Sequence, residues 1–301
     1  MILILSLLSH LGPHYNKVFY IFPISMAAPD KQLSDESVAW FSERPSSKQI
    51  TPAARHLLEN YAKIAPEEVE DHVVKVRNAA WEVFPYPCIG QFRFLELSLN
   101  RTAQYAEILQ RLKDGQRLLD MACCFGQEIR QLVFDGAPPK NVYGCDLREE
   151  YIGLGYKLFS DRDTLQSRFL TADIFDATSA LTELHGHFDI VYAGSFFHLW
   201  GYEDQVRVSV AVAKLLRPQK GSMILGRQVG AVNSAAHEHP TNPERTMFRH
   251  NVESLQKQWR EVGDQLGVSF SVEANLVELD GDHFKFHTDD TRRIHFVIRR
   301  E

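Results

Sequence analysis

The strongest constraint on the fold is a regular alternation of short apolar runs and helical stretches between residues 117 and 230. Five runs have the length and composition of buried strands: RLLDMA (117–122), NVYGCDL (141–147), RFLTAD (168–173), FDIVYAG (188–194) and SMILGRQVG (222–230). Segments with helical patterns separate these runs. This alternation is typical of βαβ units, in which parallel strands form a sheet that helices cover on both faces.

The C-terminal part of the chain extends this predicted sheet. FSVEANLVELD (270–280) and RRIHFVIRR (292–300) are strand-like and are joined by a short connection, which fits antiparallel pairing at an edge. We therefore predict an α/β fold with a Rossmann-like, seven-stranded, mostly parallel sheet, an antiparallel edge strand and a helical N-terminal cap.

The predicted cap or lid covers residues 26–115, and the sheet domain covers residues 116–301. Apolar spacing predicts a helix within residues 65–84, with Pro66 in its first turn. It predicts a second helix in residues 102–115, which begins at a Thr102 cap and stops at Gly115. Between them, FPYPCIGQFRFLEL (84–97) combines prolines and a glycine with several aromatic residues, which predicts a lid over a pocket.

The first 25 residues are apolar but do not have the pattern of a membrane span. The hydrophobic run at residues 2–8 is shorter than the roughly 20 residues that a bilayer span needs. At Met26 the composition changes to that of an ordinary N-terminus. We predict that residues 1–25 are a non-structural upstream extension and that Met26 is the working start; a weak membrane-surface anchor is the alternative.

Composition narrows the possible partners. The net charge of -6 and the lack of a stretch rich in Lys or Arg argue against nucleic acid and favour a small molecule. The four cysteines, Cys88, Cys123, Cys124 and Cys145, show neither CxxC spacing nor a companion His at zinc-finger distance. We therefore predict no metal site and no disulfide, and a cytoplasmic chain that does not bind a membrane.

A turn of small residues follows the first predicted strand. The strand ends at Asp120, and the positions that a dinucleotide fingerprint gives to glycine hold Ala122, Cys124 and Gly126. A pyrophosphate needs close backbone contact, so this turn disfavours NAD-dependent and nucleotide-sugar enzymes. S-adenosylmethionine (SAM) carries no phosphate and tolerates such substitution, so we predict a SAM site here, with Phe125 also in the turn.

Two further acids follow strands at positions where such sheets bind ligands. Asp146 lies 20 residues beyond Gly126 and can accept hydrogen bonds from both ribose hydroxyls. Asp173 could meet the adenine amino group, with Ile174 packed on the ring. The alternative for either acid is that it caps the next helix.

The loop after the fourth predicted strand holds His198 and Trp200. His198 could orient the acceptor or remove a proton, since an unperturbed histidine has a pKa of about 6.5; the alternative is a structural histidine bonded to the backbone. The connection of residues 231–251 is longer than an ordinary loop, and we predict that it forms a second lid over the pocket. His237, Glu238 and His239 lie there but, being adjacent, are poor candidates for chelating one metal ion.

Several of these motifs together resemble fungal methyltransferases of meroterpenoid biosynthesis. They are FPYPCIGQFRFLELSL (84–99), DMACCFGQEIRQLVFDGAP (120–138), YGCDL (143–147), TADIFD (171–176) and FDIVYAGSFFHLW (188–200). The resemblance runs from Asp30 to the C-terminus and implies a SAM-dependent O-methyltransferase that esterifies the carboxyl group of a farnesylated aromatic polyketide.

The resemblance also implies site residues and leaves alternatives open. The cofactor would meet Cys124 with Phe125, Asp146 with Leu147, and Asp173 with Ile174. We predict that the acceptor contacts residues of the aromatic segments and of the second lid: Tyr86, Gln91, Phe92, Phe197, Trp200 and His250. Methylation of a phenol, or a SAM-binding protein without catalysis, are the alternatives, and the apolar cap helices could support a homodimer.

Overall fold

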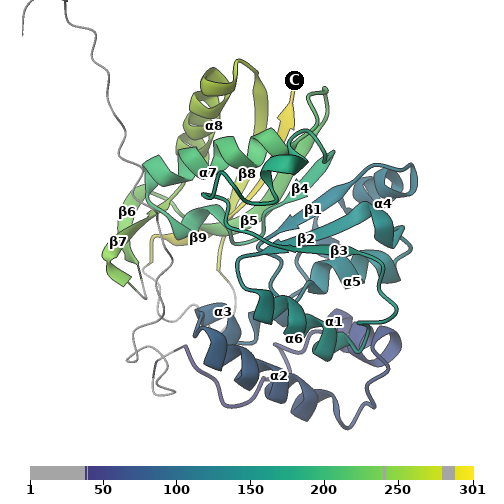
Figure 1. The fold of residues 1–301 in the computed structure, drawn as a ribbon. Helices are drawn as coiled ribbons and strands as arrows, with labels where there is room; N and C mark the ends of the chain where they lie inside the picture. Colours follow the sequence, from purple (N-terminus) through teal and green to yellow (C-terminus); the bar gives the residue numbers. More distant parts are fainter. Residues whose placement is uncertain (1–37, 39, 240–241, 280–288) are drawn as a thin grey trace, which may run out of the picture.

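The computed structural model describes residues 38, 40–239, 242–279 and 289–301 (Figure 1). The predicted upstream extension, residues 1–25, lies outside the described residues. Within them, no helix combines the length and the apolar character needed to cross a membrane.

A seven-stranded sheet forms the centre of the molecule, and its strand order is β3-β2-β1-β4-β5-β9-β8. The strands are β1 (Leu118–Met121), β2 (Val142–Asp146), β3 (Arg168–Thr171), β4 (Ile190–Tyr192), β5 (Met223–Ala231), β8 (Phe270–Val277) and β9 (Thr291–Arg300). Strands β1 to β5 pair in parallel, whereas β9 runs antiparallel to both β5 and β8. The predicted fold class is confirmed, with the antiparallel strand next to the outermost strand β8.

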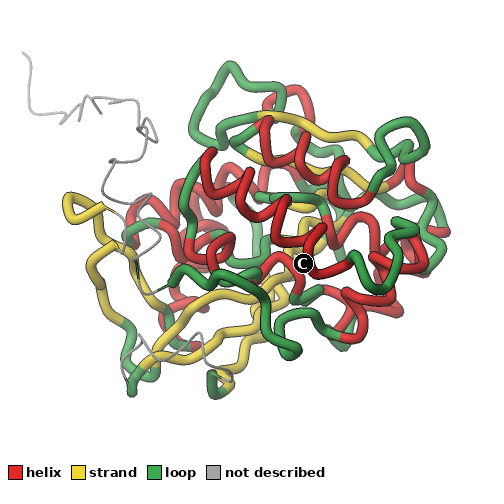
Figure 2. Tube along the Cα trace, turned by 90° about the horizontal axis from the view of Figure 1, so that it is seen from below, coloured by secondary structure: helices red, strands yellow, loops and turns green. Residues whose placement is uncertain are grey.

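Helices lie on both sides of these strands (Figure 2). One core contains residues of α7 (Tyr202–Leu215) and α8 (Val252–Leu266), and another contains residues of α4 (Tyr105–Lys113) and α5 (Gln127–Phe134). Because residues of α4 share a core with residues of β1 and β2, this helix packs against the central sheet. The short 3-10 helices η5 (Pro139–Asn141), η6 (Thr182–Leu184) and η7 (Phe197–Leu199) lie in the connections.

The N-terminal helices pack against α6 (Glu149–Phe159), at the lower side of Figure 1. They are α1 (Pro52–His56), the π-helix η2 (Leu57–Tyr61), α2 (Val69–Val83), α3 (Pro87–Gly90) and the 3-10 helix η3 (Arg93–Leu95). The next 3-10 helix, η4 (Leu99–Arg101), instead places Leu99 in the core that contains α4 and α5. His72 of α2 contacts the Leu158 carbonyl of α6 at 2.9 Å. The proposed division at residue 115 stays a prediction.

Both predicted helix starts in this region were wrong by a few residues. Pro66 lies in a hydrogen-bonded turn before α2, which begins at Val69. Thr102 does not cap α4, because its hydroxyl donates to the Leu99 carbonyl at 2.8 Å, and the cap residue is Gln104. In both places a short turn precedes the helix and contains the residue that was predicted to begin it.

The connection of residues 231–251 is a β-hairpin rather than an irregular loop. Strands β6 (Ala235–His239) and β7 (Asn242–Arg249), which lie between β5 and α8 in the sequence, form a separate two-stranded sheet at the left of Figure 1. Met247 and His239 of this hairpin reach the cavity described below. Its position agrees with the predicted second lid, although its structure does not.

Candidate active site

A cavity of about 300 Å³ opens at the carboxyl ends of strands β1, β2 and β4. Its walls include residues of the strand ends, of segment 86–98 and of the β6–β7 hairpin. Ligands of open α/β sheets bind at this edge. The cavity is therefore the candidate ligand site.

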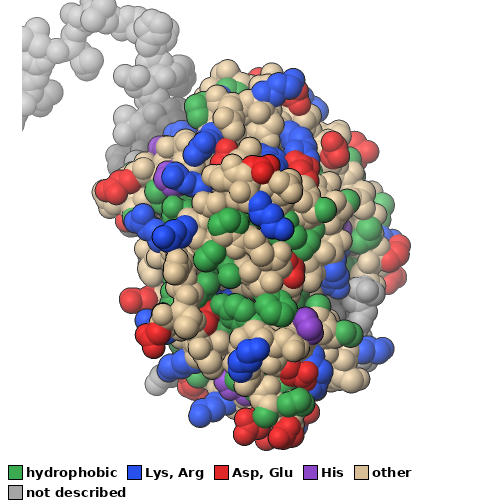
Figure 3. Space-filling view, turned by 90° about the vertical axis from the view of Figure 1, so that its right-hand side faces the viewer, with side chains coloured by type: hydrophobic (Ala, Val, Ile, Leu, Met, Phe, Trp, Pro, Cys, Tyr) green, Lys and Arg blue, Asp and Glu red, His purple; other side chains and the backbone are tan. Residues whose placement is uncertain are grey.

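On the molecular face shown in Figure 3, basic and acidic side chains are interspersed, so this face carries no extended patch of one charge.

The turn between β1 and α5 has an unusual backbone. Ala122, Cys124 and Gly126 all have positive φ angles, of 56°, 52° and 62°. This left-handed conformation favours glycine, and it costs other residues on the order of 1–3 kcal/mol each. A Cβ on Gly126 would lie 2.6 Å from Arg130 Nη1. Glycine is thus required at position 126, whereas Ala122 and Cys124 hold strained conformations where the turn faces the cavity.

Asp146 lines the cavity and also holds this turn. Its carboxylate accepts hydrogen bonds from the Cys124 N–H at 2.8 Å and the Arg148 N–H at 3.0 Å. Burial raises the pKa of Asp146, although these backbone bonds oppose the shift. Each carboxylate oxygen keeps further acceptor capacity, because a carboxylate offers about four lone-pair sites. Asp146 can therefore bind a hydroxyl-bearing ligand without releasing the turn.

Two other acids line the same region. Asp120 is buried, and its Oδ2 has no hydrogen-bond partner among the described residues. Burial, followed by the nearby Glu128 and Asp146, raises the pKa of Asp120 well above its usual value. Asp173 accepts a hydrogen bond from the Phe175 N–H at 2.9 Å, which forms a local turn rather than a helix cap. An unsatisfied buried acceptor at the cavity wall is a feature expected of a ligand site.

The cavity brings together most of the residues predicted from the sequence. Its lining includes Asp120, Ala122, Cys124, Asp146, Leu147, Asp173 and Ile174 among the predicted cofactor residues, and Tyr86, His198 and Trp200 among the others. Phe125 and Gly126 do not line it. Phe125 is fully buried in the cap core, and Gly126 precedes the first turn of α5.

Four predicted acceptor contacts lie outside the cavity, so the structure does not support that role for them. Phe92 is fully buried, with the Arg77 guanidinium 4.5 Å from its ring centroid, and Phe197 packs on Trp259. His250 is also fully buried, where Nδ1 contacts Ser254 Oγ at 2.8 Å and burial lowers its pKa to about 4. Gln91 is buried as well and does not reach the cavity. Phe92 and Phe197 belong to hydrophobic cores, and His250 and Gln91 are buried away from the cavity.

The cavity wall also carries a group of charged residues that was not predicted from the sequence. Arg93 Nε lies 3.4 Å from Glu96 Oε1, and Arg227 Nη2 donates to Glu96 Oε2. Although burial opposes ionisation, Arg93 and Arg227 lower the pKa of Glu96 to about 2. A sequence signal existed: Arg227 is a charged residue inside the apolar run SMILGRQVG (222–230).

A second group of polar residues joins β4 to the end of segment 86–98, which we call the cap connection. Glu128 of α5 accepts hydrogen bonds from the Ser98 N–H at 2.6 Å and the Leu99 N–H at 3.2 Å. Ser98 Oγ also lies 2.6 Å from the Tyr192 hydroxyl. Burial raises the pKa of Glu128, although these backbone bonds oppose the shift. This group fixes the segment that follows the charged residues against the sheet.

The remaining wall is aromatic. Trp200 meets the rings of Phe175 and Phe196 edge to face, with centroids 5.6 Å and 5.1 Å apart. Phe94 and Met247 add apolar surface from the cap connection and the hairpin. Such a wall suits a large apolar ligand with a few polar groups.

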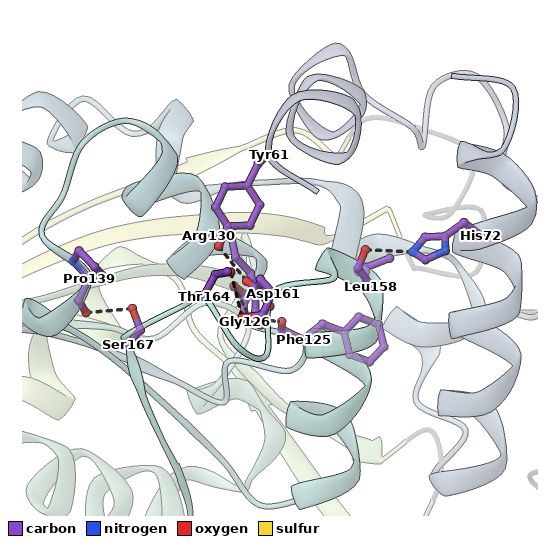
Figure 4. A network of polar contacts seen from close by, with 10 residues as sticks. All are labelled: Tyr61, His72, Phe125, Gly126, Arg130, Pro139, Leu158, Asp161, Thr164 and Ser167. Atoms are coloured by element: carbon purple, nitrogen blue, oxygen red, sulfur yellow. Dashed lines mark hydrogen bonds and ion pairs between the residues drawn. The ribbon is translucent and has the colours of Figure 1, made fainter. Parts of the chain in front are cut away.

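A buried ion pair supports the turn from behind (Figure 4). Arg130 Nε and Nη2 each lie 2.9 Å from an oxygen of Asp161, and Nη1 donates to the Phe125 carbonyl at 2.8 Å. Tyr61 of the cap donates to the same carboxylate at 2.8 Å. One network therefore ties together the turn, the end of α6 and the cap.

Comparisons with known proteins identify the family. Residues 40–95 match the family described as meroterpenoid methyltransferase N-terminal domain, and residues 118–219 match a methyltransferase domain. The chain is 41% identical over 274 residues to the O-methyltransferase atr3 of Stereocaulon alpinum, covering 90% of this chain and 79% of the relative. It is 41% identical over 227 residues to the Asnovolin E/Chermesin D methyltransferase nvfJ of Aspergillus novofumigatus, covering 75% and 81%.

This chain belongs to the meroterpenoid methyltransferase family. The methyltransferase is also 40% identical over 283 residues to the O-methyltransferase phiE of Fungal sp. (strain ATCC 74256), covering 88% of this chain and 93% of the relative. Among solved structures it is similar to a Burkholderia thailandensis N1-methyltransferase, with 14% identity, a TM-score of 0.47, and coverage of 69% and 80%. The predicted family is confirmed.

The methyltransferase uses SAM and acts as an O-methyltransferase of fungal secondary metabolism. The cavity fits this cofactor on its own geometry. The unpartnered Asp120 oxygen and the Asp146 carboxylate offer acceptors, and Ala122 and Cys124 keep the turn small beside them. Both the enzyme class and the cofactor predicted from the sequence are therefore confirmed.

Proposed function

We propose that this methyltransferase forms a methyl ester on the carboxyl group of a farnesylated aromatic polyketide. One observation carries the proposal: a single cavity joins the acid-lined strand ends to a wall of aromatic side chains. A farnesyl chain needs apolar surface, which Phe196 and Trp200 supply from β4's connection and Phe94 from the cap. The names of the relatives, which are meroterpenoid and O-methyltransferases, support the same substrate class.

The cofactor residues of this proposal are those that line the cavity. Asp146 would accept hydrogen bonds from the ribose hydroxyls and Asp173 one from the adenine amino group, while Leu147 and Ile174 pack beside them. Phe125 and Gly126 act indirectly, by shaping the turn. When bound, SAM supplies an electrophilic methyl group on a sulfonium.

The chain's own residues then have to position the acceptor rather than deprotonate it. A carboxyl group with an ordinary pKa of about 4 is already ionised at neutral pH, so no general base is needed. Alignment of the acceptor oxygen and exclusion of water can contribute several kcal/mol to lowering the barrier. Trp200 and Phe196 exclude water, and His198, which is buried at the cavity wall, orients the acceptor.

Product analysis tests the proposed function. A farnesylated 2,4-dihydroxybenzoic acid offers both a carboxyl group and phenol groups to the enzyme. With SAM we expect a single methylated product that mild alkali converts back to the acid, because alkali hydrolyses a methyl ester but not the aryl methyl ether that phenol methylation would give. Mass spectrometry before and after alkali measures this. An alkali-stable product would mean phenol methylation, and binding of SAM without any product would mean that this acid is not the acceptor.

The role of His198 gives a second prediction. His198→Asn should lower kcat/KM by about ten- to hundredfold through misplacement of the acceptor, with a profile that stays flat between about pH 6 and 8 in both enzymes. The ionised carboxylate explains the flat profile. Initial rates across this pH range measure it.

The matched control is His185→Asn, since His185 is exposed and lies outside the cavity; its rates should equal those of the wild type. A rate that rises with pH in the wild type, and loses this rise in His198→Asn, would contradict the positioning role and favour a phenol acceptor, whose pKa is about 10.

The homodimer and the cytoplasmic location stay predictions.

A further inference from the structure

A fully buried glutamine joins two segments that form part of the cavity wall. Gln205 of α7 is 0% exposed, and its Nε2 donates to the Trp200 carbonyl at 2.8 Å and to the Phe248 carbonyl at 2.7 Å. Since carbonyl oxygens only accept hydrogen bonds, the amide nitrogen has to face them. Both hydrogens of this NH2 group therefore connect the loop after β4 with strand β7 of the hairpin.

The oxygen of the same amide has no comparable contact. Gln205 Oε1 is buried and has no hydrogen-bond partner among the described residues. A buried acceptor without a partner costs free energy, which an apolar side chain of the same shape would avoid. The amide is therefore unfavourable for packing alone, and its contribution lies in the two hydrogen bonds that it donates.

Two further contacts hold the loop and the hairpin close together. The Phe248 N–H donates to the Trp200 carbonyl at 2.9 Å, so this carbonyl accepts from both the strand and the glutamine. At Gly201, a Cβ would lie 2.9 Å from Thr246 Oγ1, which is closer than ordinary van der Waals contact. Strand β7 is thus fastened to the start of α7, and this part of the hairpin is a fixed wall.

The fastened segments present two apolar side chains to the cavity. Trp200 and Met247 both line it, and both are buried. They follow β4 and β5 in the sequence, whereas the acids proposed to bind the cofactor lie at the ends of β1, β2 and β3. In the strand order β3-β2-β1-β4-β5, these two groups of strands lie on different sides. Trp200 and Met247 therefore belong to the side of the cavity that is left for the acceptor.

We propose that Trp200 and Met247 hold the farnesyl chain of the acceptor, and that Gln205 positions them by fixing the backbone of both segments. This inference rests on the proposed function, which supplies the farnesylated acceptor. A farnesyl chain has no hydrogen-bonding groups, so its affinity comes from close apolar contact. The spacing of the two side chains then decides how well the chain is held. Gln205 does not line the cavity and acts through them, as a positioning residue.

Steady-state rates test this role with farnesylated 2,4-dihydroxybenzoic acid and with the same acid without the chain. The wild type should show a kcat/KM at least about tenfold higher for the farnesylated acid. Gln205→Met keeps the length of the side chain and removes both donors. It should raise the KM of the farnesylated acid about tenfold and change kcat less than about threefold. Its kcat/KM for the chain-free acid should change less than about twofold.

Cofactor affinity is measured in the same variant, because Trp200 also meets the ring of Phe175, which follows Asp173 on the cofactor side. Titration calorimetry with S-adenosylhomocysteine (SAH) should give a dissociation constant within about twofold of the wild-type value. A merely structural role of Gln205 would instead weaken the binding of both ligands together.

Gln258→Met is the matched control. Gln258 of α8 is also 0% exposed, and its Nε2 donates to Ser209 Oγ at 2.8 Å. Neither Gln258 nor Ser209 lines the cavity. Urea unfolding should show a loss of stability in both glutamine variants, because each loses buried hydrogen bonds. Only Gln205→Met should change the KM of the farnesylated acid.

Met247→Ala tests the proposed chain contact by itself, and it gives the reading if Gln205→Met does not fold. It leaves the hydrogen bonds of Gln205 in place and removes apolar surface from the hairpin. The KM of the farnesylated acid should rise about fivefold or more, and the kcat/KM of the chain-free acid should change less than about twofold.

Several results would overturn the inference. Equal losses for the two acids, or a wild type that does not prefer the farnesylated acid, would mean that this wall does not hold the chain. Equal effects of the two glutamine variants would mean that Gln205 only stabilises the packing of α7 and α8. A loss of SAH affinity in Gln205→Met would assign the wall to the cofactor, and an unchanged KM in Met247→Ala would place the chain elsewhere.

Failure of the proposed carboxyl acceptor gives a different result. An alkali-stable methylation product would refute the methyl ester alone, because the comparison of the two acids reports on the chain whichever oxygen receives the methyl group.

Discussion

Replacement of Asp146 by asparagine is expected to raise the dissociation constant of SAM by about a hundredfold. We propose that the Asp146 carboxylate binds both ribose hydroxyls, and each such charge-assisted bond contributes roughly 1.5–3 kcal/mol. An amide has one acceptor atom and cannot replace both carboxylate oxygens, which also accept from the Cys124 and Arg148 N–H groups. Titration calorimetry with SAM and with SAH measures the loss, and the thermal stabilisation by either ligand should shrink with it.

The control for this variant is Asp135→Asn. Asp135 is an exposed acid at the end of α5 that accepts from Tyr105 and Gln131 outside the cavity. It should bind SAM like the wild type. Asp146→Asn that keeps the wild-type affinity while remaining folded would remove Asp146 from the site and, with it, the proposed placement of the cofactor.

The sheet and the cofactor side of the cavity were predictable because their signals are local. Short apolar runs between helical patterns predict buried parallel strands, and acids at strand ends meet at one edge of such a sheet. The cavity wall accordingly contains all three predicted acids, Asp120, Asp146 and Asp173. The predicted turn is also present, and its left-handed φ angles explain the glycine at position 126.

The acceptor side was not predictable, because it depends on tertiary packing. Phe196 lines the cavity and its neighbour Phe197 is in the core, so the identity of the residues does not decide which ring faces the ligand. The hairpin at residues 235–249 gave no strand signal, since its residues AAHEH (235–239) lack an apolar face. Arg227 did give a local signal, as a charged residue in an apolar run, but the sequence does not show that it lies beside Glu96 at the cavity.

The second large expected effect concerns the ion pair behind the turn. Arg130→Met should lower the free energy of unfolding by about 3–5 kcal/mol, because it leaves the Asp161 carboxylate buried and unpaired. The side chains of Arg130 and Asp161 are only 1% and 4% exposed, so water cannot replace the lost partner. Urea unfolding followed by circular dichroism measures the change. SAM affinity should fall too, since the Phe125 and Gly126 carbonyls lose their common donor.

Two variants separate the cost of an unpaired charge from the loss of packing. Arg130→Met combined with Asp161→Leu should recover most of the lost stability, because replacing both members of a buried pair by apolar residues is often close to neutral. Arg207→Met removes an ion pair whose arginine is 53% exposed and should cost about 0.5 kcal/mol or less. If the double variant were as unstable as Arg130→Met alone, then the contacts of Arg130 with the turn, rather than its pairing with Asp161, would stabilise the junction of cap and sheet.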